Sequence, residues 1–102
     1  MRQLKHKFNA KQTKVGDKKF SSKKEAAYFV KLQMLQKSGE LLFFLDQVPF
    51  RLPGNKTYRL DFMEFWADGN VILTEVKGLM TPVARIKIDQ VEEIYNVKIN
   101  IV

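Results

Sequence analysis

The stretch TYRLDFMEFWADGNVILTEVK, residues 57–77, decides the fold because it holds two strand-like runs joined by a tight turn. Aromatic and branched residues dominate both runs, and Asp68-Gly69 between them is a strong hairpin signal. The second run ends at Gly78, after two opposite charges, Glu75 and Lys77. We therefore expect a hairpin of strands over residues 57–66 and 71–77.

The elements on either side of this hairpin complete a small domain. Ser22 followed by Glu25 is typical of a helix start, and Gly39 of a helix end, while Thr81-Pro82 starts a second helix. The pattern predicts helices over 23–37 and 82–95 and two more strands over 41–52 and 97–102. The residues that could supply the buried side of the first helix include Ala26, Phe29, Val30, Leu32 and Met34, and those expected to point inward on the second are Val83, Ile86, Gln90, Val91 and Ile94. The order α-β-β-β-α-β indicates an α/β or α+β fold, with a sheet flanked by two helices.

Composition restricts the class of protein. The 102 residues are 45% hydrophobic, which suits one modest core, and they contain no cysteine. No apolar run is long enough to span a bilayer, and the first residues lack the apolar middle of a signal peptide. We expect a soluble cytoplasmic protein without a membrane partner, and any metal must bind oxygen ligands or the single His6.

The net charge of +7 is concentrated at the N-terminus. Residues 1–24 carry nine Lys or Arg and one Asp, whereas the remaining 78 residues carry nine basic and ten acidic groups. We interpret residues 1–20 as a basic arm and 21–102 as the domain. The arm favours a polyanionic partner, nucleic acid rather than a membrane surface. A disordered solubilising tail is the alternative. The apolar residues Phe8, Val15 and Phe20 favour an arm that is partly docked.

Three charged residues on the hairpin form a candidate catalytic centre. Glu75 and Lys77, two apart, project from one face of their strand, and Asp61 lies on the neighbouring strand across the turn. Phosphodiester hydrolysis needs a hard cation that takes carboxylate and carbonyl oxygens. Asp61, Glu75 and the carbonyl of Val76 could hold Mg²⁺ or Mn²⁺, with Lys77 beside it. Alternatively, these are solvated cross-strand charges and Lys77 pairs with one carboxylate.

At this point the chain resembles a known enzyme family. Asp61 and the triplet EVK at 75–77, on a hairpin between two helices, resemble the PD-(D/E)XK nuclease core. A wider likeness to small phage-encoded nucleases related to Holliday-junction resolvases covers most of the chain, through NAKQT (9–13), FSSKKEAAYF (20–29), DQVPFRL (46–52), YRLDFMEF (58–65), EVKG (75–78) and TPVARIK (81–87). Leu60 departs from the proline of the motif.

The resemblance implies a restriction-endonuclease-like αβββαβ core with a mixed sheet. It also implies Mg²⁺- or Mn²⁺-dependent cleavage of DNA, branched or duplex, by a homodimer in the cytoplasm of a bacterial host, without a small-molecule cofactor. Asp61 and Glu75 would be metal ligands and Lys77 the catalytic lysine. Resolvase-like members add an acidic residue of the first helix to the metal site, and Glu25 matches that position, although Ser22-x-x-Glu25 is also a capping box that needs no metal.

The basic side chains give the expected DNA contacts. They track phosphates and provide salt-sensitive, largely sequence-independent affinity. The candidates are Lys5, Lys7, Lys11, Lys14, Lys18, Lys19, Lys23, Lys24 and, on the second helix, Lys87. Gln47 and Gln90 are either buried polar residues or DNA contacts. Two other functions fit the same sequence: a non-catalytic nucleic-acid-binding module, and a phage structural protein that neutralises packaged DNA.

Overall fold

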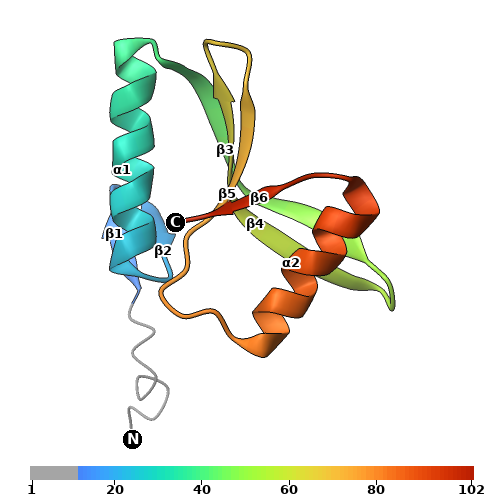
Figure 1. Cartoon of the computed structure of the whole chain (residues 1–102). Coiled ribbons are helices and arrows are strands. Elements are labelled where there is room, and N and C mark those ends of the chain that lie inside the picture. The colour runs from blue at the N-terminus through green and yellow to red at the C-terminus, as the bar shows by residue number, and fades with distance from the viewer. Residues whose placement is uncertain (1–11) are drawn as a thin grey trace, which may run out of the picture.

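The computed structural model describes residues 12–102, which form two helices, a four-stranded sheet and a small hairpin (Figure 1). The elements in chain order are β1 (Thr13–Val15), β2 (Lys18–Phe20), α1 (Lys23–Ser38), β3 (Leu41–Leu52), β4 (Lys56–Trp66), β5 (Val71–Glu75), α2 (Pro82–Tyr95) and β6 (Ile99–Ile101). From α1 onwards this is the predicted α-β-β-β-α-β order, so the α+β class is confirmed. In the described part of the chain, neither helix is long and apolar enough to cross a membrane.

The main sheet has the order β3-β4-β5-β6. Its first three strands are antiparallel, and β6 runs parallel to β5 after the crossover through α2. The β4–β5 turn contains Gly69 with φ +95°, a left-handed conformation that glycine adopts without steric cost. The sheet is therefore mixed, and the hairpin that decides the fold lies at its centre.

Both helices begin and end where the sequence predicts. Ser22 Oγ accepts a hydrogen bond from the Glu25 amide, and Gly39 closes α1 in the left-handed region. Thr81 Oγ1 accepts from Ala84 N–H at the start of α2. The strand boundaries differ more, since β5 ends at Glu75 rather than at Lys77 and β6 covers only Ile99–Ile101 of the predicted 97–102. Lys77 lies just beyond the strand, where its N–H donates to the carbonyl of Val102.

The core has two halves, one for each helix, and the helices lie on either side of the sheet (Figure 1). α1 buries Ala26, Phe29 and Leu32 against residues that include Leu41 and Phe62. α2 buries Ile88 and Val91 against the other half, which contains Phe50, Leu52, Tyr58, Leu60, Leu73 and Ile99. Apolar burial of this kind contributes roughly 25 cal/mol per Å² and is the main source of stability.

The predicted inward faces of the helices were partly wrong. Val30 and Met34 of α1 were expected to be buried and are exposed. On α2 the exposed residues are Val83, Ile86, Gln90 and Ile94, all of which were expected to point inward. Val91, which was also expected to point inward, is buried, and the other buried residue of α2 is Ile88. Because α2 has apolar residues on more than one face, periodicity alone did not fix its rotation.

The β1–β2 hairpin is an addition that the sequence analysis did not predict. Phe20 at its end is buried and lies 4.9 Å, centroid to centroid, from Phe29 of α1. Val15 packs at the edge of the same cluster. Part of the basic segment is therefore folded onto the domain, as Val15 and Phe20 had indicated, whereas Phe8 lies outside the described residues.

Candidate functional site

Asp61 and Glu75 face each other across the β4–β5 hairpin. Phe62 pairs with Thr74 and Met63 with Leu73, and this register continued by one residue places Asp61 opposite Glu75. Asp61 Oδ2 accepts a hydrogen bond of 2.8 Å from Val76 N–H, which fixes the carboxylate against the end of β5. Glu75 is only 4% exposed. The structure thus brings together the two carboxylates that the sequence analysis assigned to a cation.

The acidity of Asp61 reflects this environment. Burial first, and then the negative charges of Glu75 and Glu25, raise its pKa from 3.8 to about 7, against the opposing effect of the Val76 N–H. A carboxyl group that resists ionisation in this way lies where negative charge is insufficiently compensated. A cation at this position would relieve that repulsion.

Glu75 is held by a tyrosine and a lysine. The Tyr58 hydroxyl donates a buried hydrogen bond to Glu75 Oε1, and burial together with this bond raises the pKa of Tyr58. Lys77 Nζ lies 3.3 Å from Glu75 Oε2, and the Lys77 side chain is 28% exposed. Lys77 is therefore adjacent to the carboxylates while solvent can still reach its ammonium group. Tyr58 was not singled out in the sequence, because a tyrosine in an aromatic-rich strand gives no distinguishing signal.

Glu25 takes part in the helix cap through its backbone N–H, whereas its carboxylate makes separate hydrogen bonds to Ser21 and Gln47. Its N–H donates to Ser22 Oγ at 3.1 Å. Its side chain is buried, with Oε1 accepting from the Ser21 hydroxyl at 2.8 Å and Oε2 accepting from Gln47 Nε2 at 3.2 Å. The capping role and a role in the site are therefore compatible. The Ser21-Ser22 doublet was the only sequence signal for the Ser21 contact.

Gln47 links this helix carboxylate to the hairpin. Its Nε2 also lies 3.5 Å from Asp61 Oδ1, a longer and weaker contact. Gln47 occupies a strand but has φ +52°, a left-handed conformation that costs a non-glycine residue about 1–2 kcal/mol. Sequence analysis gave Gln47 no place in the metal site. The available signal was the polar pair Asp46-Gln47 inside a strand that, apart from Arg51, is otherwise apolar.

The donor chemistry of the site suits a hard divalent cation, but its acidic groups are not tightly clustered. Asp61 and Glu75 offer carboxylate oxygens, and Val76 offers a carbonyl close by. Within residues 12–102, no set of three or more His, Cys, Asp or Glu side chains gathers as a metal-binding group. The contacts explain this spacing, because the Gln47 amide lies between Glu25 and Asp61. The two hairpin carboxylates form the compact part of the site, and Glu25 lies farther out.

Several predicted DNA-contacting lysines lie near Glu25, Gln47 and Lys77 of the candidate site. Lys24 Nζ donates to the carbonyl of Lys77 at 3.0 Å. Lys18 forms a 2.8 Å ion pair with Asp46. Lys18 and Lys19 also line a pocket of about 320 Å³ that includes Ser21, Glu25 and Gln47. The β1–β2 hairpin therefore brings basic side chains to the mouth of the candidate site.

The other predicted contacts are less closely connected. Lys14 and Lys23 are exposed, Lys14 opposite Lys19 in the hairpin and Lys23 at the start of α1. Lys87 is half-buried on α2, and no hydrogen bond or ion pair of residues 12–102 links it to the site. Lys5, Lys7 and Lys11, like His6, lie outside the described residues.

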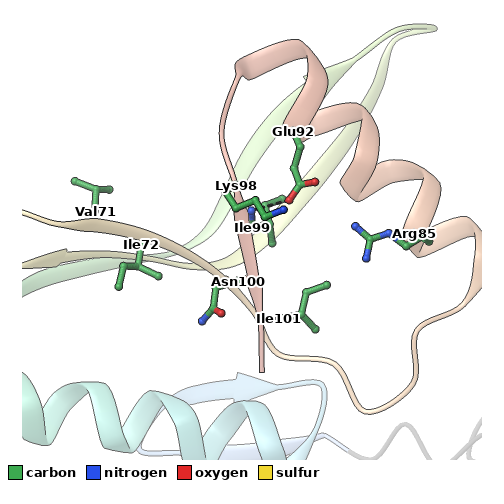
Figure 2. A pocket seen from close by; sticks show the side chains of 8 residues that line it. All are labelled: Val71, Ile72, Arg85, Glu92, Lys98, Ile99, Asn100 and Ile101. Carbon is green, nitrogen blue, oxygen red and sulfur yellow. Dashed lines mark hydrogen bonds between the residues drawn. The ribbon is translucent and has the colours of Figure 1, made fainter.

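A larger groove lies away from the carboxylates, between β5, β6 and α2 (Figure 2). It has a volume of about 560 Å³. Arg85 and Glu92 reach it from α2, and its other lining residues are Val71, Ile72, Lys98, Ile99, Asn100 and Ile101 (Figure 2). Arg85 is paired with Asp89, and Glu92 accepts from the Ile99 N–H, so the two charged groups that α2 contributes already have structural partners. We assign the candidate site to the hairpin carboxylates.

Comparison with known proteins places the chain in a family. A family model described as "Protein of unknown function (DUF1064)" matches residues 5–102. The chain belongs to this family. The match includes Glu25, Asp61, Glu75 and Lys77, so the whole candidate site lies inside the DUF1064 region. No curated protein and no solved structure matches the chain.

Proposed function

We propose that this DUF1064 protein is a metal-dependent DNA endonuclease of the PD-(D/E)XK type. One observation carries the proposal: two carboxylates, Asp61 and Glu75, meet across a hairpin with the Lys77 ammonium 3.3 Å from Glu75. A protein that only binds DNA gains nothing from such a pair, because carboxylates repel phosphates when no cation lies between them. Burial and the nearby charges of Glu75 and Glu25 raise the pKa of Asp61, and a cation bound there would counter both effects.

In this proposal each residue of the site has its own role in binding the metal, in catalysis or in positioning the carboxylates. Asp61, Glu75 and the Val76 carbonyl would hold Mg²⁺ or Mn²⁺, and Glu25 would complete the site from α1. The cation would neutralise charge that develops on the phosphate and increase the acidity of a water molecule. Lys77 would position that water or stabilise the same charge. The Tyr58 hydroxyl and the Val76 N–H hold the carboxylates in place.

The DNA would approach from the side of the β1–β2 hairpin and the start of α1. Lys18 and Lys19 lie there beside Glu25 and Gln47, and Lys24 beside Lys77, and all three would contact phosphates without reading sequence. We extend the proposal to branched DNA, to a homodimer in which two centres make two cuts, and to the cytoplasm of a phage-infected bacterium. The support for these three points is the resemblance to resolvase-related phage nucleases.

Cleavage assays test the proposal directly. Four-way junction, flap, duplex and single-stranded DNA are incubated with the full chain in Mg²⁺, Mn²⁺ or EDTA. We expect cutting with either metal, none in EDTA, and a loss of at least about 100-fold in Lys77→Ala. Lys37→Ala, an exposed lysine in the last turn of α1, is the matched control and should cut normally.

The same assays distinguish the alternatives. If every substrate survives in both metals while DNA binding persists, the protein is a non-catalytic nucleic-acid-binding module. If the protein does not cut DNA, and its binding to long duplex DNA saturates when the bound protein neutralises the DNA charge, the phage structural protein would be favoured. Preferential cutting of the junction over the flap and the duplex would support the branched-DNA substrate, whereas equal cutting would remove it.

A further inference from the structure

We infer that Gln47 is a positioning residue that sets the separation between Glu25 and Asp61, and so decides whether the α1 carboxylate joins the cation site. The inference rests on the proposed function and deepens it. Neither the family description nor the resemblance assigns Gln47 a role. It comes from three properties of Gln47: its backbone conformation, its two carboxylate contacts and its place in the pocket beside Lys18 and Lys19.

The backbone is the first observation. Among the described residues, three non-glycine residues have positive φ: Gln47, Asn55 and Asn96. Asn55 lies in the β3–β4 turn and Asn96 ends α2, two places where asparagine often adopts this conformation. Gln47 alone of the three lies within a strand, opposite Asp61, where neighbouring pairs 46–62 and 48–60 are regular. An outlier of this kind indicates a functional constraint at Gln47.

The side-chain contacts are the second observation. The Gln47 amide group donates to Glu25 Oε2 at 3.2 Å and approaches Asp61 Oδ1 at 3.5 Å. From β3 it links Glu25 of α1 to Asp61 of β4, in addition to the direct hydrogen bonds that Lys24 and Tyr28 of α1 make to Lys77 and Glu64. An amide can hold two carboxylates through its NH₂ group, and its oxygen is a ligand type that Mg²⁺ accepts. Gln47 is thus suited to hold Glu25 near Asp61 in the absence of a cation and to remain beside a cation that enters.

The pocket is the third observation. Gln47 and Glu25 both line the cavity of about 320 Å³, together with Lys18 and Lys19 of β2. Gln47 is an exposed residue, so a cation or a phosphate arriving through this pocket meets its amide. A glutamine that only stabilised the fold would have no need to lie at this opening.

Titration calorimetry with Mn²⁺, on the full chain without DNA, tests the inference. Gln47→Gly removes the amide but keeps a residue that tolerates φ +52°. We expect it to weaken Mn²⁺ binding about tenfold, as losses of groups that orient metal ligands do. Asn55→Gly changes a left-handed residue at a turn remote from the carboxylates and should bind Mn²⁺ like the wild type. In a Glu25→Gln background, Gln47→Gly should have little further effect.

A second variant gives an opposite signature. Gln47→Glu adds a carboxylate beside Glu25 and Asp61, so it should lower the thermal midpoint in EDTA at pH 8. The added oxygen should also strengthen Mn²⁺ binding, and the rise of the midpoint with Mn²⁺ should exceed that of the wild type. A purely structural glutamine would lose stability in this variant without the compensating gain.

The outcomes separate the inference from the proposed function. Wild-type Mn²⁺ affinity in Gln47→Gly, or weaker Mn²⁺ binding in Gln47→Glu, overturns the role of Gln47 and leaves the nuclease proposal intact. An equal tenfold loss in the Glu25→Gln background also overturns it, because Gln47 would not then act through Glu25. A wild-type chain that neither binds Mn²⁺ nor cuts DNA overturns the proposed function and this inference together.

Discussion

Val76 N–H donates a 2.8 Å hydrogen bond to Asp61 Oδ2, which ties the residue directly after β5 to the carboxylate on β4. This bond favours ionised Asp61, yet burial and the charges of Glu75 and Glu25 outweigh it and raise the pKa to about 7. Asp61 is therefore preorganised for a positive ligand but strained electrostatically without one.

The first prediction concerns stability and pH in the absence of metal. The unfolded chain loses the Asp61 proton near pH 3.8, whereas the folded chain holds it to about pH 7. The stabilising contribution of protonated Asp61 is therefore complete below pH 3.8 and is lost as pH rises to 7. Because solvent reaches part of this side chain, we expect a loss of about 1–2 kcal/mol rather than the full value.

Urea unfolding in EDTA at several pH values measures this effect. Asp61→Asn keeps a carbonyl to accept from Val76 N–H and should lack the decline between pH 4 and 7. Its stability relative to the wild type should therefore increase with pH and level off above about pH 7. Asp89→Asn, at an exposed site on α2, is the control. Parallel pH profiles for wild type and Asp61→Asn would show that Asp61 ionises normally.

The hairpin part of the site was predictable from sequence for a physical reason. The turn at Asp68-Gly69 sets the register of the two hairpin strands, and so it determines which residues lie opposite each other. Asp61 and Glu75, with thirteen residues between them, are therefore brought face to face. Local turn chemistry also set the helix ends at Ser22 and Thr81. Such features depend on neighbours in the chain, and they agree with the structure.

The features that could not be predicted from the sequence depend on packing between segments that are distant in the chain. Gln47 reaches Glu25 only because the chain adopts a left-handed conformation inside a strand, for which its residue type gives no signal. The rotation of α2 follows from which of its apolar residues fits the sheet, and Ile88 is buried where Ile86 was expected. The docking of Phe20 on Phe29 likewise requires the α1 face to be in place first.

The second prediction concerns the Tyr58 hydroxyl. Tyr58→Phe removes the donor to Glu75 Oε1 and leaves the ring in the core. We expect Mn²⁺ affinity and cleavage rate each to fall about tenfold, because loss of a group that orients a metal ligand has this size of effect. Tyr95→Phe is a matched control, since its hydroxyl bonds the Arg51 backbone away from the carboxylates. Equal effects of the two substitutions would exclude a specific role for Tyr58.

The third prediction concerns Glu64, a buried carboxylate outside the site. Its oxygens accept from the Tyr28 hydroxyl at 2.7 Å and from Trp66 Nε1 at 3.0 Å. Burial and the hydrogen bond to Glu64 raise the pKa of Tyr28 to about 12. Glu64→Leu leaves two donors without acceptors and should cost about 2–4 kcal/mol of unfolding free energy.

Calorimetry separates this structural effect from a functional one. Glu64→Leu should lower thermal stability while the Mn²⁺ affinity of the folded protein stays within about twofold of wild type. Glu93→Gln, an exposed glutamate of α2, should change neither quantity. A large loss of Mn²⁺ affinity in folded Glu64→Leu would mean that Glu64, rather than Asp61 and Glu75 alone, contributes to the site.

The last prediction concerns the charges at the mouth of the pocket. Lys19 is exposed on β2, and Lys18 beside it is paired with Asp46 at 2.8 Å. Lys19→Ala should weaken duplex binding and lower the slope of log affinity against log salt by about one, as expected for one lost phosphate contact. Asp46→Asn should have the opposite effect, because it frees Lys18 for a phosphate. Binding measured by fluorescence anisotropy in Ca²⁺, from 50 to 200 mM salt, gives both slopes, with Lys37→Ala as the distant control. Equal slopes for Lys19→Ala and Lys37→Ala would place the DNA on another face of the protein.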